Sequence, residues 1–99
     1  MNEPPRHAPS AAEVEAALRA ALQPVAVEVR DDSHLHAGHA GAREGRHFSV
    51  RIVAGRFEGL TRLARHRLVY DALGPWMPSG IHALALTTLA PAEASRPEA

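Results

Sequence analysis

The sequence predicts a small α/β domain of the α+β type, with helices on one face of a three-stranded mixed sheet in the order αββαβ. Two stretches of helical periodicity, two stretches of strict alternation and a final apolar run predict this class. The chain has 99 residues, 45% of them hydrophobic, which is typical of one packed domain. We expect the domain to span residues 10–90, between a disordered arm at 1–9 and a frayed tail at 91–99.

The first helix is predicted to begin at a capping box. The Ser10 side chain caps the start of the helix, while the Glu13 side chain reaches back to the cap. Pro24 ends the helix, because proline cannot continue the helical hydrogen bonding. Apolar residues at spacings of three and four mark its buried face: Val14, Ala17, Leu18, Ala21 and Leu22.

Two strands are predicted next. Valines alternate with other residues over 25–30, and Phe48, Val50 and Ile52 alternate with polar residues over 47–52. Alternation of β-branched and aromatic residues with a period of two is typical of half-buried strands. We expect the two strands to pair antiparallel across a histidine-rich loop.

The second half of the domain is predicted to be a helix followed by a strand. Leucine and alanine recur every four residues over 60–73, which indicates a helix with one apolar face. Phe57, in the turn before it, and Tyr70, within it, are expected in the core. The continuous apolar run at 81–89 predicts a third strand, and we expect it to be buried on both faces.

Composition excludes several functions. The chain has no cysteine, so it can form neither disulfides nor cysteine-based metal sites. No apolar run approaches the roughly 20 residues that cross a membrane, and residues 1–10 do not resemble a signal peptide. We therefore expect a cytoplasmic protein with no membrane partner. The sequence has no nucleotide-binding motif and no serine-nucleophile motif, so we expect no enzymatic activity and no small-molecule substrate.

A basic segment lies within a chain whose net charge is zero. Residues 43–67 contain seven arginines and two acids. Such a segment can attract phosphates or an acidic protein surface. The plain alternative is a solvated basic surface.

Seven histidines are the most unusual feature of the composition. One lies in the predicted N-terminal arm, three in the predicted loop, one opens the second strand, one lies on the second helix and one opens the third strand: His7, then His34, His36 and His39, then His47, His66 and His82. Imidazole binds zinc, copper and iron. The spacing matches no zinc motif. The alternative to metal binding is that the loop histidines are exposed polar residues and that His82 is a core histidine hydrogen-bonded to the backbone.

Five short motifs follow one another between residues 27 and 88, a stretch of about 60 residues. They are Asp31-Asp32-Ser33 with His36, His47-Phe48-Ser49-Val50, Arg56-Phe57-Glu58-Gly59, Arg65-His66-Arg67-Leu68-Val69-Tyr70, and Gly-Ile-His-Ala-Leu-Ala-Leu at 80–86. In this order and spacing the motifs resemble those of the BolA family. The acidic residue and tryptophan common at the end of that family are replaced here by Ala92-Glu93-Ala94.

The resemblance implies a fold like the type II KH domain and partnership with a monothiol glutaredoxin. In such a heterodimer a [2Fe-2S] cluster is held by a glutaredoxin cysteine, by glutathione and by two ligands from the BolA-like chain. By motif, these two ligands are His82 and His36, and His34 or His39 could replace His36. The chain alone is expected to hold no cofactor.

Two other functions stay open. The first is transcriptional regulation through DNA binding, although the chain has no net positive charge and no GxxG loop. The second is binding of zinc or copper without a partner, through a loop histidine together with His47 or His82. For DNA binding, phosphate contacts would come from basic residues near the second helix: Arg56, Arg62, Arg65, His66 and Arg67.

Overall fold

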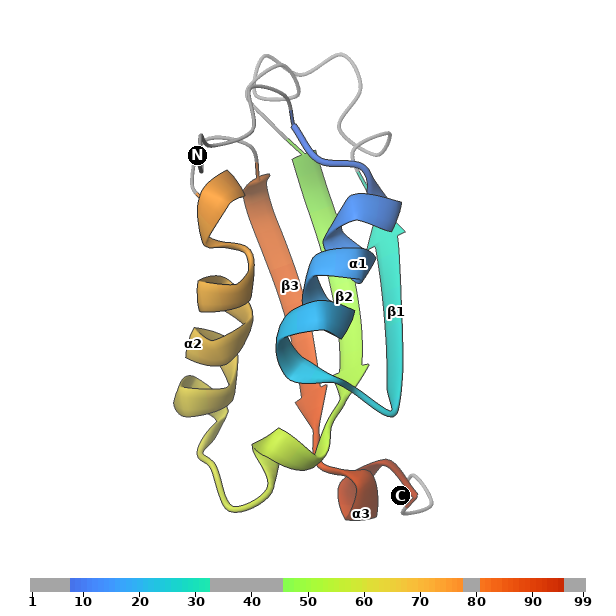
Figure 1. Ribbon diagram of the computed structural model, residues 1–99, viewed down its shortest axis with the longest axis vertical. Helices are drawn as coiled ribbons and strands as arrows, with labels where there is room; N and C mark the ends of the chain where they lie inside the picture. The colour runs from blue at the N-terminus through green and yellow to red at the C-terminus, as the bar shows by residue number, and fades with distance from the viewer. Residues whose placement is uncertain (1–7, 33–45, 78–80, 96–99) are drawn as a thin grey trace.

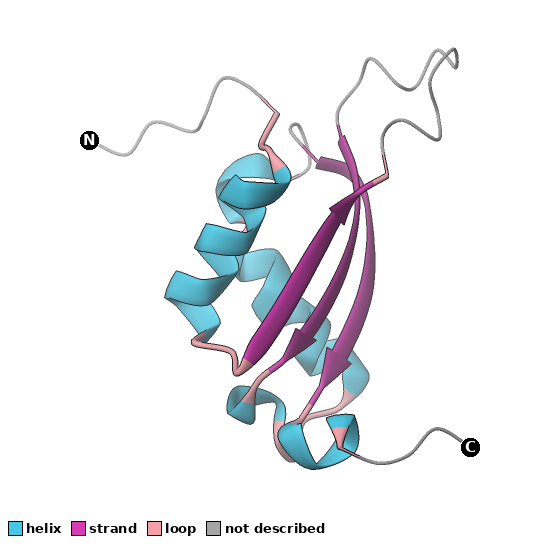
Figure 2. Cartoon of the chain, turned by 90° about the vertical axis from the view of Figure 1, so that its right-hand side faces the viewer, coloured by secondary structure: helices cyan, strands magenta, loops and turns pink. Residues whose placement is uncertain are grey.

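The structure, a computed structural model, describes residues 8–32, 46–77 and 81–95. Its main elements are α1 (Ala11–Leu22), β1 (Ala26–Asp31), β2 (Arg46–Val53), α2 (Arg62–Ala72), β3 (Ile81–Leu89) and α3 (Pro91–Ala94). Short 3₁₀ helices at Gly55–Phe57 and Gly74–Trp76 flank α2. Helices α1 and α2 lie side by side on one face of the sheet (Figure 1), and in the view from the side none of the described helices covers the other face (Figure 2).

The sheet is mixed, as the sequence predicts. Its strand order is β1-β2-β3, with β2 antiparallel to β1 and parallel to β3. Helix α2 lies in the crossover that a parallel pair requires. Asp31 pairs with Phe48, and Phe48 pairs with Leu84. The end of β1 and the beginnings of β2 and β3 therefore meet at one end of the sheet (Figure 1).

The predicted capping box at the start of α1 is confirmed. The Ser10 N–H donates to Glu13 Oε1 at 2.8 Å, and the Glu13 N–H donates to Ser10 Oγ at 3.1 Å. Gln23 closes the helix in a left-handed conformation with φ of 48°. Most of the predicted apolar face packs into the core, with Val14, Leu18 and Leu22 buried and Ala17 packed against them. Ala21, predicted on the same face, is exposed.

The core lies between the helices and the sheet. Its largest buried side chains come from β2, the turn before α2, α1, the C-cap of α2 and β3: Phe48, Ile52, Phe57, Leu18, Leu73 and Ile81. The prediction that Phe57 is a core residue is confirmed, but the same prediction for Tyr70 is wrong, because this side chain is 40% exposed. Successive helical residues point about 100° apart, so burial of Val69 turns Tyr70 outward.

Strand β3 is buried on one face only, which corrects the prediction of burial on both. Ala83, Ala85 and Thr87 are exposed, whereas Leu84 and Leu86 pack against the core. The exposed side chains are small, and this is why the run reads as continuously apolar. No second layer of described residues covers this face (Figure 2).

The two ends of the domain are more ordered than the sequence predicts. Pro9, within the predicted arm, is fully buried. Residues 91–95, within the predicted frayed tail, include the short helix α3, which Glu93 joins to Arg65. Residues 1–7 and 96–99 lie outside the described residues. Among the described helices, none has the length and apolar character of a membrane-spanning segment.

Candidate functional site

His82 lies at a break in the register between β2 and β3. Arg46 pairs with Ile81, but the next residue of β2, His47, pairs with Ala83. His82 is therefore one extra residue on β3, with no opposite residue on β2. An extra residue of this kind forms a bulge, which interrupts the regular ladder and redirects the local strand. The bulge places the backbone of His82 at the end of the sheet where three strand ends meet.

The three loop histidines, His34, His36 and His39, lie outside the described residues. The segment that carries them leaves the sheet after Asp32 and returns at Arg46. Both points lie at the same end of the sheet as His82 (Figure 1). The topology thus brings both ends of the histidine-bearing segment close to the start of β3. The pairing of His36 with His82 as ligands stays a prediction.

Asp32 anchors this end of the sheet. Its backbone N–H donates to the carbonyl of His47 at 2.7 Å, extending the β1–β2 ladder by one residue. Its carboxylate accepts a hydrogen bond from Arg30 Nε at 2.9 Å and another from the hydroxyl of Ser49. The side chain is only 15% exposed. Sequence reasoning missed this cluster, although antiparallel pairing places Asp32 and Ser49 on the same face.

A shallow hollow of about 260 Å³ lies beside this cluster on the face of the sheet opposite α1 and α2. Its lining includes Asp32 and His47, and the small side chains of Ala83 and Ala85 leave room beside them. Within residues 8–32, 46–77 and 81–95, no three histidine, aspartate or glutamate side chains come together as a metal site. These residues alone therefore give no support to a zinc or copper site.

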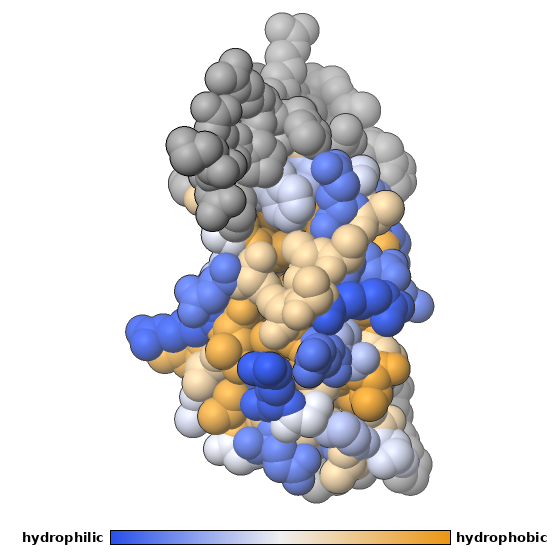
Figure 3. Space-filling view, viewed as in Figure 1, coloured by the Kyte–Doolittle hydropathy of each residue, from blue (hydrophilic) through white to orange (hydrophobic). Residues whose placement is uncertain are grey.

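The basic residues near α2 differ in how much their side chains are exposed to solvent. Arg56, Arg62 and Arg67 are exposed, and His66 is half-buried. On the helix-bearing side of the molecule, hydrophilic side chains project from the flank where α2 lies (Figure 3). These three arginines could contact a phosphate without rearrangement of the described residues.

Arg65, in contrast, is used inside the fold. Its side chain is 11% exposed. Its Nε donates to the carbonyl of Leu60 and its Nη1 to the carbonyl of Thr88, both at 3.0 Å. Nη1 also meets Glu93 Oε1 at 2.6 Å, and the guanidinium lies 6.0 Å from the ring centroid of Phe57. Arg65 thus joins α2, β3 and α3, and its donors are not directed to a ligand.

These features define the class of protein: a small α+β domain with a bulged histidine at one end of its sheet and an arginine-bearing helix on its flank. The family model described as "BolA-like protein" matches residues 18–93. The chain belongs to the BolA family.

Individual relatives agree with this assignment. The chain is 45% identical over 82 residues to "SufE-like protein 1, chloroplastic/mitochondrial" of Arabidopsis thaliana, a match that covers 77% of this chain and 22% of the relative. It is 45% identical over 75 residues to "DNA-binding transcriptional regulator BolA" of Escherichia coli (strain K12), covering 76% and 70%. The solved "BolA domain of SufE1 from Arabidopsis thaliana" matches with a TM-score of 0.73 and 43% identity, over 84% of this chain and 93% of that one.

Proposed function

We propose that this chain is a non-enzymatic adaptor that shares a [2Fe-2S] cluster with a monothiol glutaredoxin, in iron–sulfur cluster trafficking or iron-linked regulation. One observation supports the proposal most directly. The bulged residue His82 lies at the end of the sheet where the segment carrying His34, His36 and His39 leaves and returns. A histidine at this end of the sheet and a second one from the segment that begins and ends there would together be suitable ligands for one iron.

The donor set of the chain agrees with a shared cluster. The chain has no cysteine, so thiolate ligands have to come from a partner, here a glutaredoxin cysteine and its bound glutathione. Histidine can replace cysteine on one iron of a [2Fe-2S] cluster and raises its reduction potential. This chain would contribute the imidazoles of His82 and of one loop histidine. The bulge would hold the backbone of His82 in place, and the segment between β1 and β2 would supply the second ligand.

The test is reconstitution of the heterodimer. The full chain is mixed anaerobically with a monothiol glutaredoxin, glutathione, iron and sulfide, and visible absorption and circular dichroism are compared with those of glutaredoxin alone. We expect a changed spectrum on a one-to-one heterodimer. An unchanged spectrum together with no complex would refute the proposal.

Single variants assign the ligands. His82→Ala should abolish the shared cluster with the fold intact, and His66→Ala is the matched control because it removes a half-buried histidine from α2. His34→Ala, His36→Ala and His39→Ala identify the loop ligand. Far-UV circular dichroism and thermal unfolding report whether each variant is folded. If His82→Ala holds the cluster as well as wild type, the assignment of His82 is wrong.

A second candidate function, DNA-binding transcriptional regulation, is favoured by the exposure of Arg56, Arg62 and Arg67. One relative is also named as such a regulator. Each phosphate contact contributes about −0.9 to the slope of log affinity against log salt. Fluorescence anisotropy with duplex DNA at several salt concentrations should therefore show a smaller slope for Arg62→Ala and for Arg67→Ala. A slope near zero for wild type would exclude this function.

A further inference from the structure

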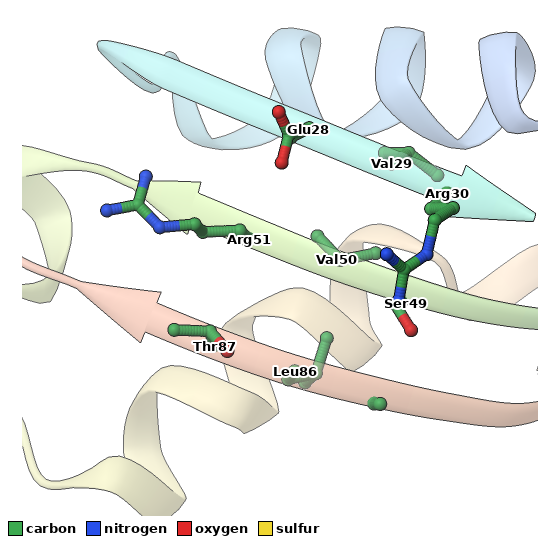
Figure 4. Close-up of a pocket in the computed structure, with 9 residues that line it drawn as sticks. Glu28, Val29, Arg30, Ser49, Val50, Arg51, Leu86 and Thr87 are labelled. Atoms are coloured by element: carbon green, nitrogen blue, oxygen red, sulfur yellow. The ribbon is translucent and has the colours of Figure 1, made fainter.

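The sheet face opposite the helices carries a hollow of about 640 Å³ that crosses all three strands. We call this the open face and define it by six residues that line the hollow: Glu28, Arg30, Ser49, Arg51, Ala85 and Thr87. All of these except Ala85 are labelled in Figure 4. Neither the cluster proposal nor the DNA-binding proposal uses this surface. Within the described parts of the chain, no helix covers it.

The six residues form two parallel rows across the sheet. In one row Glu28, Arg51 and Thr87 lie opposite one another on β1, β2 and β3. The next row contains Arg30, Ser49 and Ala85 in the same strand order. On β1, therefore, a carboxylate and a guanidinium stand two residues apart on the same face.

The side chains of Glu28 and Arg30 are both accessible to a partner. Glu28 is exposed, and the Arg30 side chain is 74% exposed although its Nε donates to Asp32 at 2.9 Å. In Figure 4 the Arg30 side chain turns down towards Ser49, while the Arg51 side chain extends away from Arg30. The small side chains of the open face, Ser49, Ala85 and Thr87, lie on β2 and β3.

This charge pattern is complementary to itself under two-fold rotation. Consider two open faces that meet across a two-fold axis. The axis lies in the plane between the two sheets, perpendicular to the strands and midway between the two rows. Each row then lies over the other row of the second copy. Glu28 then faces Arg30 of the second copy, and Arg30 faces its Glu28. Arg51 faces Ser49 of the second copy. Such an isologous contact is the commonest form of homodimer interface.

We propose that the open face is the interface of a homodimer in which two sheets pack face to face. The small side chains of Ser49 on β2 and of Ala85 and Thr87 on β3 permit the spacing of roughly 10 Å at which sheets stack. A nucleic acid fits this surface less well, because Glu28 and Asp32 balance the charges of Arg30 and Arg51. The proposed dimer leaves α2 outside the interface, so it does not depend on the DNA-binding candidate.

The test is charge reversal followed by sedimentation velocity of the full chain from micromolar to millimolar concentration. Wild type should self-associate. Glu28→Arg and Arg30→Glu should each weaken association by about tenfold, because two symmetric attractions become repulsions in each dimer. The double variant Glu28→Arg/Arg30→Glu should restore it. Glu58→Arg is the control, with the same charge change on an exposed residue outside the sheet.

Mixing the two single variants sharpens the test. In a mixed pair the arginine introduced at position 28 of one variant meets the glutamate introduced at position 30 of the other. The two weakly associating proteins should therefore form a heterodimer with wild-type affinity. A chain that is monomeric throughout the concentration range, or single variants that associate as wild type does, would overturn the proposal. So would a monomer for which Glu28→Arg strengthens DNA binding and Arg30→Glu weakens it, because the open face would then bind nucleic acid.

Discussion

The ion pair between Arg65 and Glu93 joins α2 to the C-terminal helix, and we predict that Glu93→Ala destabilises the fold by about 2 kcal/mol. The substitution removes three contacts of the carboxylate. These are to Arg65 Nη1 at 2.6 Å, to Arg65 Nη2 at 3.3 Å and to the N–H of Ala90 at 2.7 Å. Of the acceptors that hold Arg65 in the fold, the carbonyls of Leu60 and Thr88 would remain.

The magnitude follows from the burial of the two partners. A hydrogen bond to a charged group contributes about 1.5–3 kcal/mol, and loss of a helix cap costs about 1 kcal/mol. The Glu93 side chain is 36% exposed, so water replaces part of what is lost and the sum is reduced to about 2 kcal/mol. In a domain of this size, 1 kcal/mol shifts Tm by about 4–8 °C, so the expected decrease in Tm is roughly 10 °C.

Urea and thermal denaturation followed by far-UV circular dichroism measure the effect. Glu93→Gln keeps an oxygen for the N–H of Ala90 but removes the charge, so it should cost about half as much as Glu93→Ala. Glu15→Ala is the control. It removes an exposed i,i+4 pair with Arg19 and should cost less than about 0.5 kcal/mol. If Glu93→Ala costs no more than Glu15→Ala, the contact between α2 and α3 does not stabilise the domain.

Four further substitutions test the fold by urea denaturation. Phe57→Ala empties a fully buried site and should cost about 3–5 kcal/mol, whereas Tyr70→Ala on the exposed side of α2 should cost less than about 1 kcal/mol; similar losses would mean that Tyr70 is also a core residue. Ser10→Ala removes the cap of Glu13 N–H and should cost about 1 kcal/mol; no loss would show that the box is not required. Asp32→Asn should cost about 1 kcal/mol by weakening the bonds from Arg30 and Ser49; a stabilised variant would contradict that role.

Local patterns were enough to predict most of the architecture. The capping box at Ser10 and Glu13, the period of α1 and the alternation along β2 depend on residues a few positions apart, and the structure has all three. Alternation also limits where strands can pair, which explains why the antiparallel β1–β2 pair was predictable. The sequence predicted a mixed sheet without saying which strand β3 joins, and the structure pairs β3 parallel with β2.

Features that depend on contacts between residues far apart in the chain were harder to predict from the sequence. The sequence shows an apolar run at 81–89, but only the sheet topology shows that one of its faces has no covering layer among the described residues. Tyr70 has the chemistry of a core residue, and the orientation of α2 decides otherwise. The bulge at His82 has no sequence signal of its own, because it depends on how two strands 35 residues apart align.

Arg65 illustrates why a charge pattern alone does not define a binding surface. In the sequence, Arg65 and Arg67 flank His66 and look equivalent. In the fold, Arg65 points towards Phe57 and meets a carboxylate 28 residues away, whereas Arg67 is exposed. The positive charge that α2 offers to a phosphate is therefore smaller than the sequence indicates. An Arg65→Ala variant that loses DNA binding would report on the stability of the domain as much as on a phosphate contact, so the DNA-binding candidate is better tested at Arg62 and Arg67.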